Sequence, residues 1–249
     1  MSSRKPPTTS CLQDILFDQG FGTRRICAGL VQQGHVAVDG STVTDPLSEW
    51  PVEGLRLRVQ GMDWVCQPVA YAMLHKPAGV EVSQKPKHHV SVYSLLPFPL
   101  RQRPSKGTAG VQAVGRLDED TTGLLLLSDD GQFIHRMSSP KHHVPKVYEV
   151  TTVHALDERQ LQRLLSGVVL DDDPKPVRAA AAVQVSPTHL QLTLTEGKYH
   201  QVKRMLAAVG NRVAALHRSE VGELVLGDLP LGDWRWLTPD EVAALTRKR

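Results

Sequence analysis

The stretch GRLDEDTTGLLLLSDDG, residues 115–131, decides the fold class of the larger part of this chain. It places an arginine and three acidic residues directly before the chain's most apolar run, and a turn-forming SDDG directly after it. The run GLLLLS is too short for a typical helix and is bounded by turn signals, so it predicts a buried strand. Asp118 is then expected at a loop–strand junction, beside a rigid element of the kind that holds functional groups best.

The residues around Asp118 leave its role open. Arg116 lies two positions before it, so a structural Asp–Arg pair and a catalytic carboxylate are both compatible with the sequence. Residues 118–122 also fit D-x-D-x-T, the nucleophile motif of haloacid-dehalogenase-like phosphatases, which use Mg²⁺. In that family the apolar strand precedes the first aspartate, whereas here the apolar run follows it. The phosphatase interpretation is therefore kept only as an alternative.

The segments around this motif mix helical and strand patterns without strict alternation. Helices are expected in GQFIHRMSS, LDERQLQRLLSG, GKYHQVKRMLAAVGN and TPDEVAALTRKR, and strands in KVYEVTTV, VQVSPTHLQLTLT, RVAALHR and GELVLGDL. The last helix has a capping box, with Thr238 as the cap and Glu241 three positions on. This order predicts an α+β domain with a mixed, mostly antiparallel sheet flanked by helices.

The first sixty residues predict a separate small unit. A helix ending at Gly20 is followed by a second helix capped by Thr23, a hairpin at Asp39-Gly40 and a strand over 55–59. The leader MSSRKPPTTS cannot bury enough surface to become ordered, and it lacks the apolar core of a secretory signal. We expect a disordered leader over 1–9, a small domain over 10–62, a linker over 63–69 and a larger domain over 70–249.

The basic residues are grouped, although the formal net charge is only +3. Three segments carry five, six and three Lys or Arg against at most one acid each: 198–218, 71–107 and 135–148. Such segments favour a polyanionic partner, because each neutralised phosphate releases counterions. No apolar run is long enough to span a membrane. The three scattered cysteines indicate reduced thiols, neither a disulfide framework nor a zinc site, and so a cytoplasmic protein.

Several motifs in one order carry a resemblance that covers nearly the whole chain. They are GRLDEDTTGLLLLSDDG, YAMLHKPAGVEVS, SPKHHVPKVYEV, TEGKYHQVKRMLAAVGNRVAALHR and LGDLPLGDWRWLTPDE. Together they resemble the ribosomal pseudouridine synthases of the RsuA type, with His75 where asparagine is usual. The helix–helix–hairpin unit at the start resembles the small RNA-binding domain shared with ribosomal protein S-four.

The resemblance implies an isomerase that turns uridine in RNA into its C-glycoside isomer without a cofactor or metal. It implies Asp118 as the nucleophile, Tyr148 as the aromatic that stacks on the uracil, Lys203 as the cation beside Asp118, and Arg116 as a phosphate contact at the flipped-out site. RNA contacts are expected from Arg24, Arg25, Lys76, His142, His143, His200, Gln201 and Arg204. The adjacent histidine pairs are poor metal ligand sets, so RNA contact or simple exposure is expected for them.

The expected partner is rRNA, with 16S rRNA favoured by the SPKHH and EGKYHQVKRM segments, either naked or in a partially assembled small subunit. The protein is expected to be a monomer. Three alternatives remain: a synthase acting on 23S rRNA, an rRNA-binding assembly factor without catalysis, and the phosphatase. The target nucleotide, the atom attacked (ribose C1′ or uracil C6) and the angle between the domains do not follow from the sequence.

Overall fold

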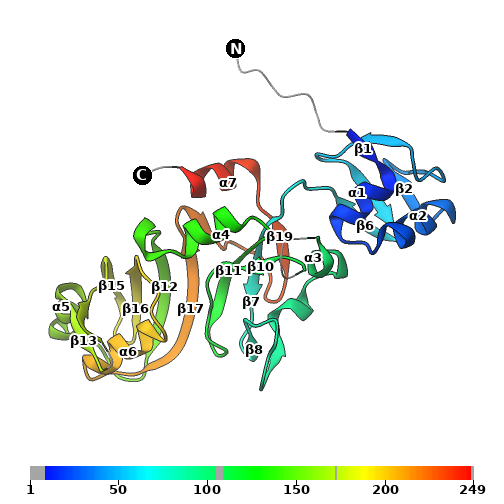
Figure 1. Cartoon of the computed structure of the whole chain (residues 1–249). Helices are drawn as coiled ribbons and strands as arrows, with labels where there is room; N and C mark the ends of the chain where they lie inside the picture. The colour runs from blue at the N-terminus through cyan, green and yellow to red at the C-terminus, as the bar shows by residue number, and fades with distance from the viewer. Residues whose placement is uncertain (1–8, 105–108, 172, 248–249) are drawn as a thin grey trace, which may run out of the picture. The chain divides into compact units, whose positions relative to one another are not determined.

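The computed structural model describes residues 9–104, 109–171 and 173–247, and these form two compact units (Figure 1). The smaller unit holds the described residues up to Ala70 together with Leu96–Gln112, and the larger unit holds Tyr71–Leu95 and Ala113 onward. The leader expected over 1–9 lies outside the described residues except for Thr9, which begins the first strand.

Within the described residues, the smaller unit has three helices and a short antiparallel sheet of order β3-β2-β5-β6. A further pair, β1 and β4, is also antiparallel. The elements are β1 (Thr9–Cys11), α1 (Leu12–Gln19), α2 (Arg24–Gln32), β2 (Val36–Val38), β3 (Ser41–Thr42), β4 (Glu49–Pro51), β5 (Arg56–Val59), β6 (Met62–Val65) and α3 (Phe98–Gln102). Strand β6 occupies the start of the segment 63–69 that the sequence suggested as a linker.

Local signals in the sequence account for the turns of this unit. Helix α1 ends at Gly20, whose φ of 93° is left-handed, and a Cβ there would lie 2.2 Å from the carbonyl oxygen of Pro99. Thr23 accepts a hydrogen bond from the Ile26 amide and so caps α2. Asp39 and Gly40 both have positive φ, as the tight hairpin between β2 and β3 requires.

The larger unit is built on one sheet with helices beside it (Figure 1). Its strands are β7 (Tyr71–Lys76), β8 (Val80–Glu81), β9 (Val90–Ser91), β10 (Gln112–Ala113), β11 (Thr122–Ser128), β12 (Lys146–Thr152), β13 (Val168–Leu170), β14 (Asp173–Val177), β15 (Ala181–Ser186), β16 (His189–Leu194), β17 (Val213–Val221), β18 (Leu224–Val225) and β19 (Trp234–Trp236). Its helices are η1 (Val92–Leu95), α4 (Gly131–Ser138), η2 (Pro140–His142), α5 (Glu158–Ser166), α6 (Gln201–Ala208) and α7 (Pro239–Thr246).

The main sheet has the order β15-β16-β12-β17-β11-β7-β19, with β10 paired to β11 and β18 to β17. Along this order every neighbouring pair is antiparallel except β11 and β17, which are parallel. This parallel pair is short, joining only Thr122 to His217 and Gly123 to Arg218. The prediction of a mixed, mostly antiparallel sheet is confirmed.

Strand β11 is the centre of the larger unit, as the leucine run predicts. Leu124, Leu125, Leu126 and Leu127 are all at most 1% exposed. Leu124 and Leu126 belong to a cluster that includes Phe133 and Met137 of α4, together with Leu245 of α7. The turn before β11 is therefore anchored to the most buried strand of the unit. No helix among the described residues is long and apolar enough to cross a membrane.

Candidate active site

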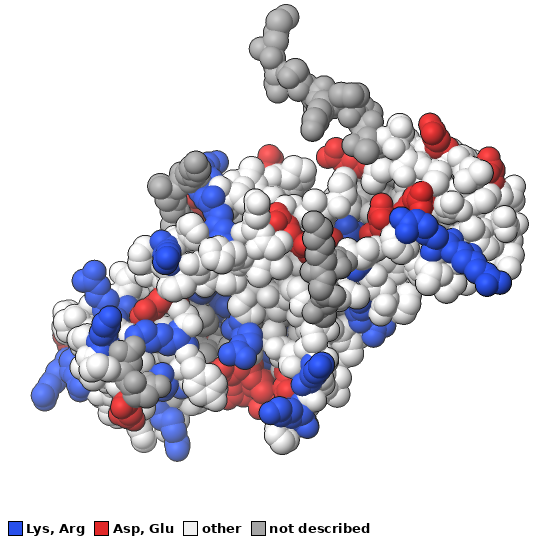
Figure 2. Space-filling model, viewed as in Figure 1, with Lys and Arg blue, Asp and Glu red and all other residues white. Residues whose placement is uncertain are grey.

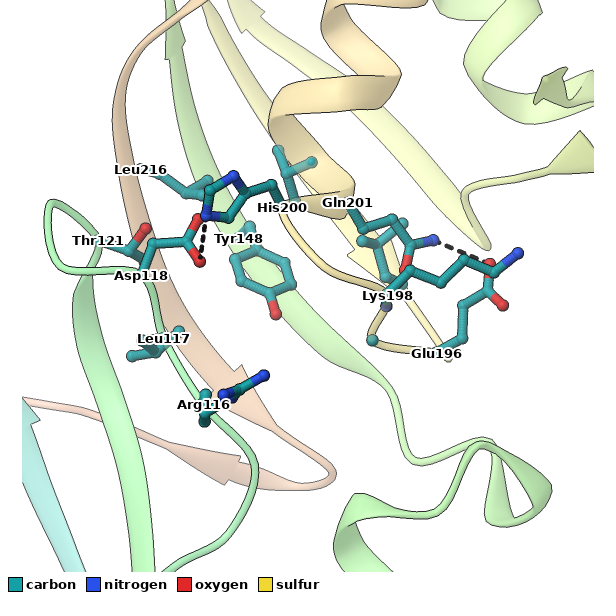
Figure 3. A pocket seen from close by; sticks show the side chains of 13 residues that line it. Arg116, Leu117, Asp118, Thr121, Tyr148, Glu196, Lys198, His200, Gln201 and Leu216 are labelled. Carbon is teal, nitrogen blue, oxygen red and sulfur yellow. Dashed lines mark hydrogen bonds and ion pairs between the residues drawn. The ribbon is translucent and has the colours of Figure 1, made fainter. Parts of the chain in front are cut away.

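Asp118 lies in the tight turn that leads into β11. The Thr121 amide donates to the Asp118 carbonyl oxygen at 3.1 Å, which closes the turn. The carboxylate contacts two groups from a later part of the sequence. Lys203 Nζ lies 3.2 Å from Oδ2. His200 Nε2 lies 3.4 Å from Oδ1 (Figure 3). The Asp118 side chain is a quarter exposed, so a substrate can reach it.

Lys203 binds a second carboxylate more closely than it binds Asp118. Its Nζ lies 2.6 Å and 2.9 Å from the two carboxylate oxygens of Asp120. Burial raises the pKa of Asp120, but the hydrogen bond and charge of Lys203 outweigh it, and the pKa lies below the usual value. Burial lowers the pKa of Lys203, but the two carboxylates outweigh it, and the pKa lies above the usual value. The lysine is therefore charged at neutral pH and shared by both acids.

A cavity opens beside Asp118 and is lined from five parts of the larger unit. Arg116, Leu117, Asp118 and Thr121 come from the turn before β11, Tyr148 from β12, Leu194 from the end of β16 and Leu216 from β17. The segment 196–202 at the start of α6 completes the lining. Tyr148 is 9% exposed and extends between this segment and the Asp118 turn, while Arg116 is exposed (Figure 3). The cavity combines an acid, cations and an aromatic ring, as recognition of a nucleotide requires.

The segment at the start of α6 is fixed by its own hydrogen bonds. Gln201 donates its side-chain amide to Glu196 Oε1 at 2.8 Å and accepts from the Lys198 amide at 2.8 Å. His200 has a φ of 47°, a left-handed conformation that is uncommon outside glycine. Its ring stacks on exposed Tyr199 with centroids 3.7 Å apart. Gln201 was expected to contact RNA, but at 4% exposure its amide organises this segment.

Lys76 does not lie where an RNA contact requires it. Its side chain is fully buried, and Nζ donates to the carbonyl oxygens of Pro77, Glu119 and Thr121 at 2.9–3.0 Å. Burial lowers its pKa to about 8, and nearby carboxylates oppose that change only partly. The expectation that Lys76 binds RNA is wrong, because a buried ammonium with three carbonyl partners cannot reach a phosphate. It instead secures the turn that presents Asp118.

The other residues predicted to bind RNA lie in three places. Arg204 is on α6, and its Nη1 donates to the Tyr199 carbonyl oxygen at 3.1 Å. Arg24 and Arg25 open α2 in the smaller unit, and Arg24 pairs with Asp14 at 2.7 Å. His142 and His143 are exposed and line a second cavity of the larger unit. The cavity at Asp118 thus gathers only part of the predicted set.

Sequence reasoning missed three residues of this site. Asp120 is the tightest partner of Lys203, and the only signal for it was its place two residues after Asp118. Tyr199 stacks on His200 and is 69% exposed. Thr121 Oγ1 lines the cavity region and is the one buried side-chain polar atom, among the described residues, without a hydrogen-bond partner. The presence of a threonine in the motif did not predict a buried hydroxyl without a hydrogen-bond partner beside the cavity.

No group of three or more His, Cys, Asp or Glu residues that could hold a metal occurs within the described ranges. Asp118 precedes β11, at the amino end of the strand. The phosphatase alternative requires the aspartate at the carboxyl end of a preceding strand, so this arrangement does not fit it. All three cysteines are free thiols.

Comparison with known proteins agrees with this geometry. The family model described as RNA pseudouridylate synthase matches residues 70–208, and the S4 domain model matches residues 12–47. The ribosomal small subunit pseudouridine synthase A of Yersinia pestis is 37% identical over 93% of this chain and 97% of its own length. The protein of the same name from Escherichia coli K12 is 37% identical over 93% and 98%.

A solved pseudouridylate synthase structure matches with a TM-score of 0.66 and 33% identity, and the match covers 95% of this chain and 100% of that one. Both the sequence motifs and the whole larger unit are therefore accounted for by one family. This chain belongs to the RNA pseudouridylate synthases, in the RsuA-type branch that joins an S4 domain to the catalytic domain.

Proposed function

We propose that this pseudouridine synthase isomerises one uridine of small-subunit (16S) rRNA, with Asp118 as covalent nucleophile and no cofactor. The contact that carries the proposal is Asp118 with Lys203 at 3.2 Å, at the edge of a cavity that Tyr148 lines. The rRNA class is supported by the names of the similar proteins, which are synthases of the ribosomal small subunit.

The reaction is an isomerisation, so atoms and electrons balance within the nucleotide. The bond from ribose C1′ to uracil N1 breaks, and a bond from C1′ to uracil C5 forms. The proton of C5 leaves, and N1 gains one. The Asp118 carboxylate bonds transiently to the nucleotide, at ribose C1′ or uracil C6, and the Lys203 ammonium stabilises the carboxylate before attack and after release. The ion pairs of Lys203 with Asp118 and with Asp120 support this role of the ammonium group.

The target base must leave its helix to reach Asp118, which costs a few kcal/mol in lost stacking. Tyr148 lines the cavity and provides an aromatic face for the uracil, and in this proposal its hydroxyl assists proton transfer at C5. Arg116 is exposed at the edge of the same cavity and meets the phosphate of the extruded nucleotide. These contacts offset part of the cost of extrusion.

The proposal is tested with unmodified 16S rRNA, on which pseudouridine is mapped by a carbodiimide-dependent stop of reverse transcription. Wild type is expected to mark one position, and Asp118→Asn none, while RNA affinity changes little. Glu119→Gln is the matched control, because Glu119 is the neighbouring acid and contacts His89 at 3.7 Å. Equal modification by wild type and Asp118→Asn would refute the nucleophile assignment. A reaction that stops in EDTA would refute the cofactor-free mechanism.

The same assay separates the two remaining alternatives. A reverse-transcription stop on 23S rRNA and none on 16S rRNA would show that the substrate is the RNA of the large subunit. Tight binding to rRNA without any stop, in naked RNA and in partially assembled subunits alike, would instead fit an assembly factor. Both results would contradict the proposed substrate or activity.

A further inference from the structure

A second cavity of about 580 Å³ lies in the larger unit, where α4, η2, the turn between β17 and β18, and the end of α7 meet. Five basic residues from three separate segments line it: Arg136, Lys141, His142, His143 and Arg247. Its remaining lining is mostly apolar and small, with Val144, Leu245 and Ala244 among it. Nothing in the proposed chemistry at Asp118 uses these residues.

The charge of this cavity is strongly one-sided. Glu223 is its one acidic lining residue, against two arginines, one lysine and two histidines. In Figure 2, blue side chains are scattered over this face of the larger unit, and the largest red group lies low on it with blue side chains beside it. A concave surface lined by one sign of charge concentrates ligands of the opposite charge.

One of the basic side chains, Arg136, is held by a backbone carbonyl. Arg136 Nη2 donates to the Arg247 carbonyl oxygen at 2.6 Å, which ties the guanidinium to the end of α7. His143 has a φ of 48°, so the chain reverses sharply between η2 and β12. Residues other than glycine rarely adopt this conformation. Lys141, His142 and His143 are all exposed at this turn.

Two chain segments join this cavity to the one at Asp118. Val144 lines the second cavity and Tyr148 the first, four residues apart along β12 and its approach. Leu216 likewise lines the first cavity and Gly222 the second, and these two residues are six positions apart along β17 and the turn after it. At about 3.3 Å per residue these separations are roughly 13 and 20 Å. A nucleic acid whose target nucleotide occupies the first cavity can therefore reach the second with its flanking nucleotides.

We propose that this second cavity binds the phosphodiester backbone of the RNA substrate, a few nucleotides from the target uridine. The inference rests on the proposed RNA substrate, and it adds a contact that positions the RNA without touching the reacting atoms. Arginine and lysine around a cavity suit phosphate oxygens, which fix register on an RNA and carry no sequence information themselves.

The test uses the double variant Lys141→Gln/Arg247→Gln in the full chain. Arg136 donates to the backbone carbonyl of Arg247, so replacing the Arg247 side chain leaves this hydrogen bond in place. Arg159→Gln/Arg178→Gln is the matched control, because it removes two exposed charges elsewhere in the same unit. Binding of a long 16S fragment is measured by filter retention across a salt series, and KM and kcat are measured on the same RNA and on a minimal hairpin around the target.

The double variant is expected to bind the long RNA about tenfold more weakly, with its slope of log affinity against log salt reduced by about 1.5, since each phosphate contact contributes roughly 0.7–0.9 to that slope. We expect KM to rise while kcat stays constant, and the minimal hairpin to show no difference between the proteins. A salt slope equal to that of the control, or an equal defect on the hairpin, would overturn the inference. Because binding is measured without turnover, this result does not depend on whether pseudouridine forms.

A third result would also overturn it. If the double variant matches the control on naked RNA but is impaired only on partially assembled subunits, the cavity meets a protein and not the RNA backbone.

Discussion

Lys203 and Asp120 form a tighter ion pair than Lys203 and Asp118, with N–O distances of 2.6 Å and 3.2 Å. The lysine is thus anchored by an acid other than the proposed nucleophile. The raised pKa of Lys203 and the lowered pKa of Asp120 keep both groups charged at neutral pH. If Asp118 bonds to the substrate as proposed and loses its charge, Lys203 still has the carboxylate of Asp120 as a partner and is expected to stay in place.

Lys203 and Asp120 are expected to contribute unequally to turnover. Lys203→Met removes the cation beside Asp118 and should lower kcat by about 10²–10³-fold, the usual effect of losing one electrostatic group of an active site. Asp120→Asn leaves the Asp118–Lys203 contact and should lower kcat by less than about tenfold, a loss of anchoring alone. Single-turnover kinetics on 16S rRNA would measure both. Equal losses in the two variants would contradict the anchoring role.

The substitutions that position 200 tolerates are predicted to depend on its backbone conformation as well as on the imidazole ring of His200. His200→Asn and His200→Gly suit a left-handed φ and should keep the melting temperature close to wild type. His200→Val should cost about 1–3 kcal/mol, since a branched side chain is strained there. The contact of the imidazole with Asp118 at 3.4 Å implies that all three variants lose activity. If His200→Asn retains full turnover, the imidazole has no part in the reaction.

Gly123 is predicted to tolerate no side chain. Its φ is 111°, and a Cβ would lie 2.3 Å from the Arg218 carbonyl oxygen and 2.6 Å from the Arg218 amide nitrogen. Because both atoms are backbone of the paired strand β17, Gly123→Ala should separate β11 from β17 and cost more than about 3 kcal/mol. Urea unfolding measures this, with Gly131→Ala as control, where a Cβ meets open space. A Gly123→Ala protein as stable as the control would show that the parallel pair is dispensable.

Lys76 is predicted to make stability depend on pH above neutrality. Its folded pKa of about 8 lies below the value of 10.5 for a free lysine, so the unfolded chain binds more protons between these values. The unfolding free energy of wild type should therefore rise with pH across this window, relative to a variant that lacks the group. Lys76→Met should be less stable at pH 7 by about 1–3 kcal/mol, because buried carbonyls lose their donor. Urea titrations at pH 7 and 9.5 should show the deficit growing, and a constant deficit would disprove the assignment.

Features that depend on near neighbours in the chain follow from the sequence. The cap at Thr23, the turn at Asp39-Gly40 and the capping box of Thr238 and Glu241 each need only a few adjacent residues, and all three are present. The buried strand at the leucine run is also predictable, because its composition and bounding turns admit few other structures.

Features that depend on distant segments do not follow from it. Asp120 and Lys203 are 83 positions apart, and no local pattern favours Asp120 over Asp118 as the closer partner. Lys76 is buried because the turn at 119–121 folds over it, so its basic character alone suggested exposure. Leu96–Gln112 groups with the smaller unit because the bare backbone at Gly20 allows the chain at Pro99 to approach closely.

The short parallel pairing of β11 and β17 divides the main sheet of the larger unit into two groups of strands. Asp118 precedes β11 in one group, whereas Tyr148 lies on β12 in the other group and Lys203 on the helix beside it. A nucleotide that contacts residues of both groups of strands opposes their separation. A bound nucleotide should therefore stabilise the domain against unfolding. On heating, the catalytic residues should separate before either group of strands unfolds.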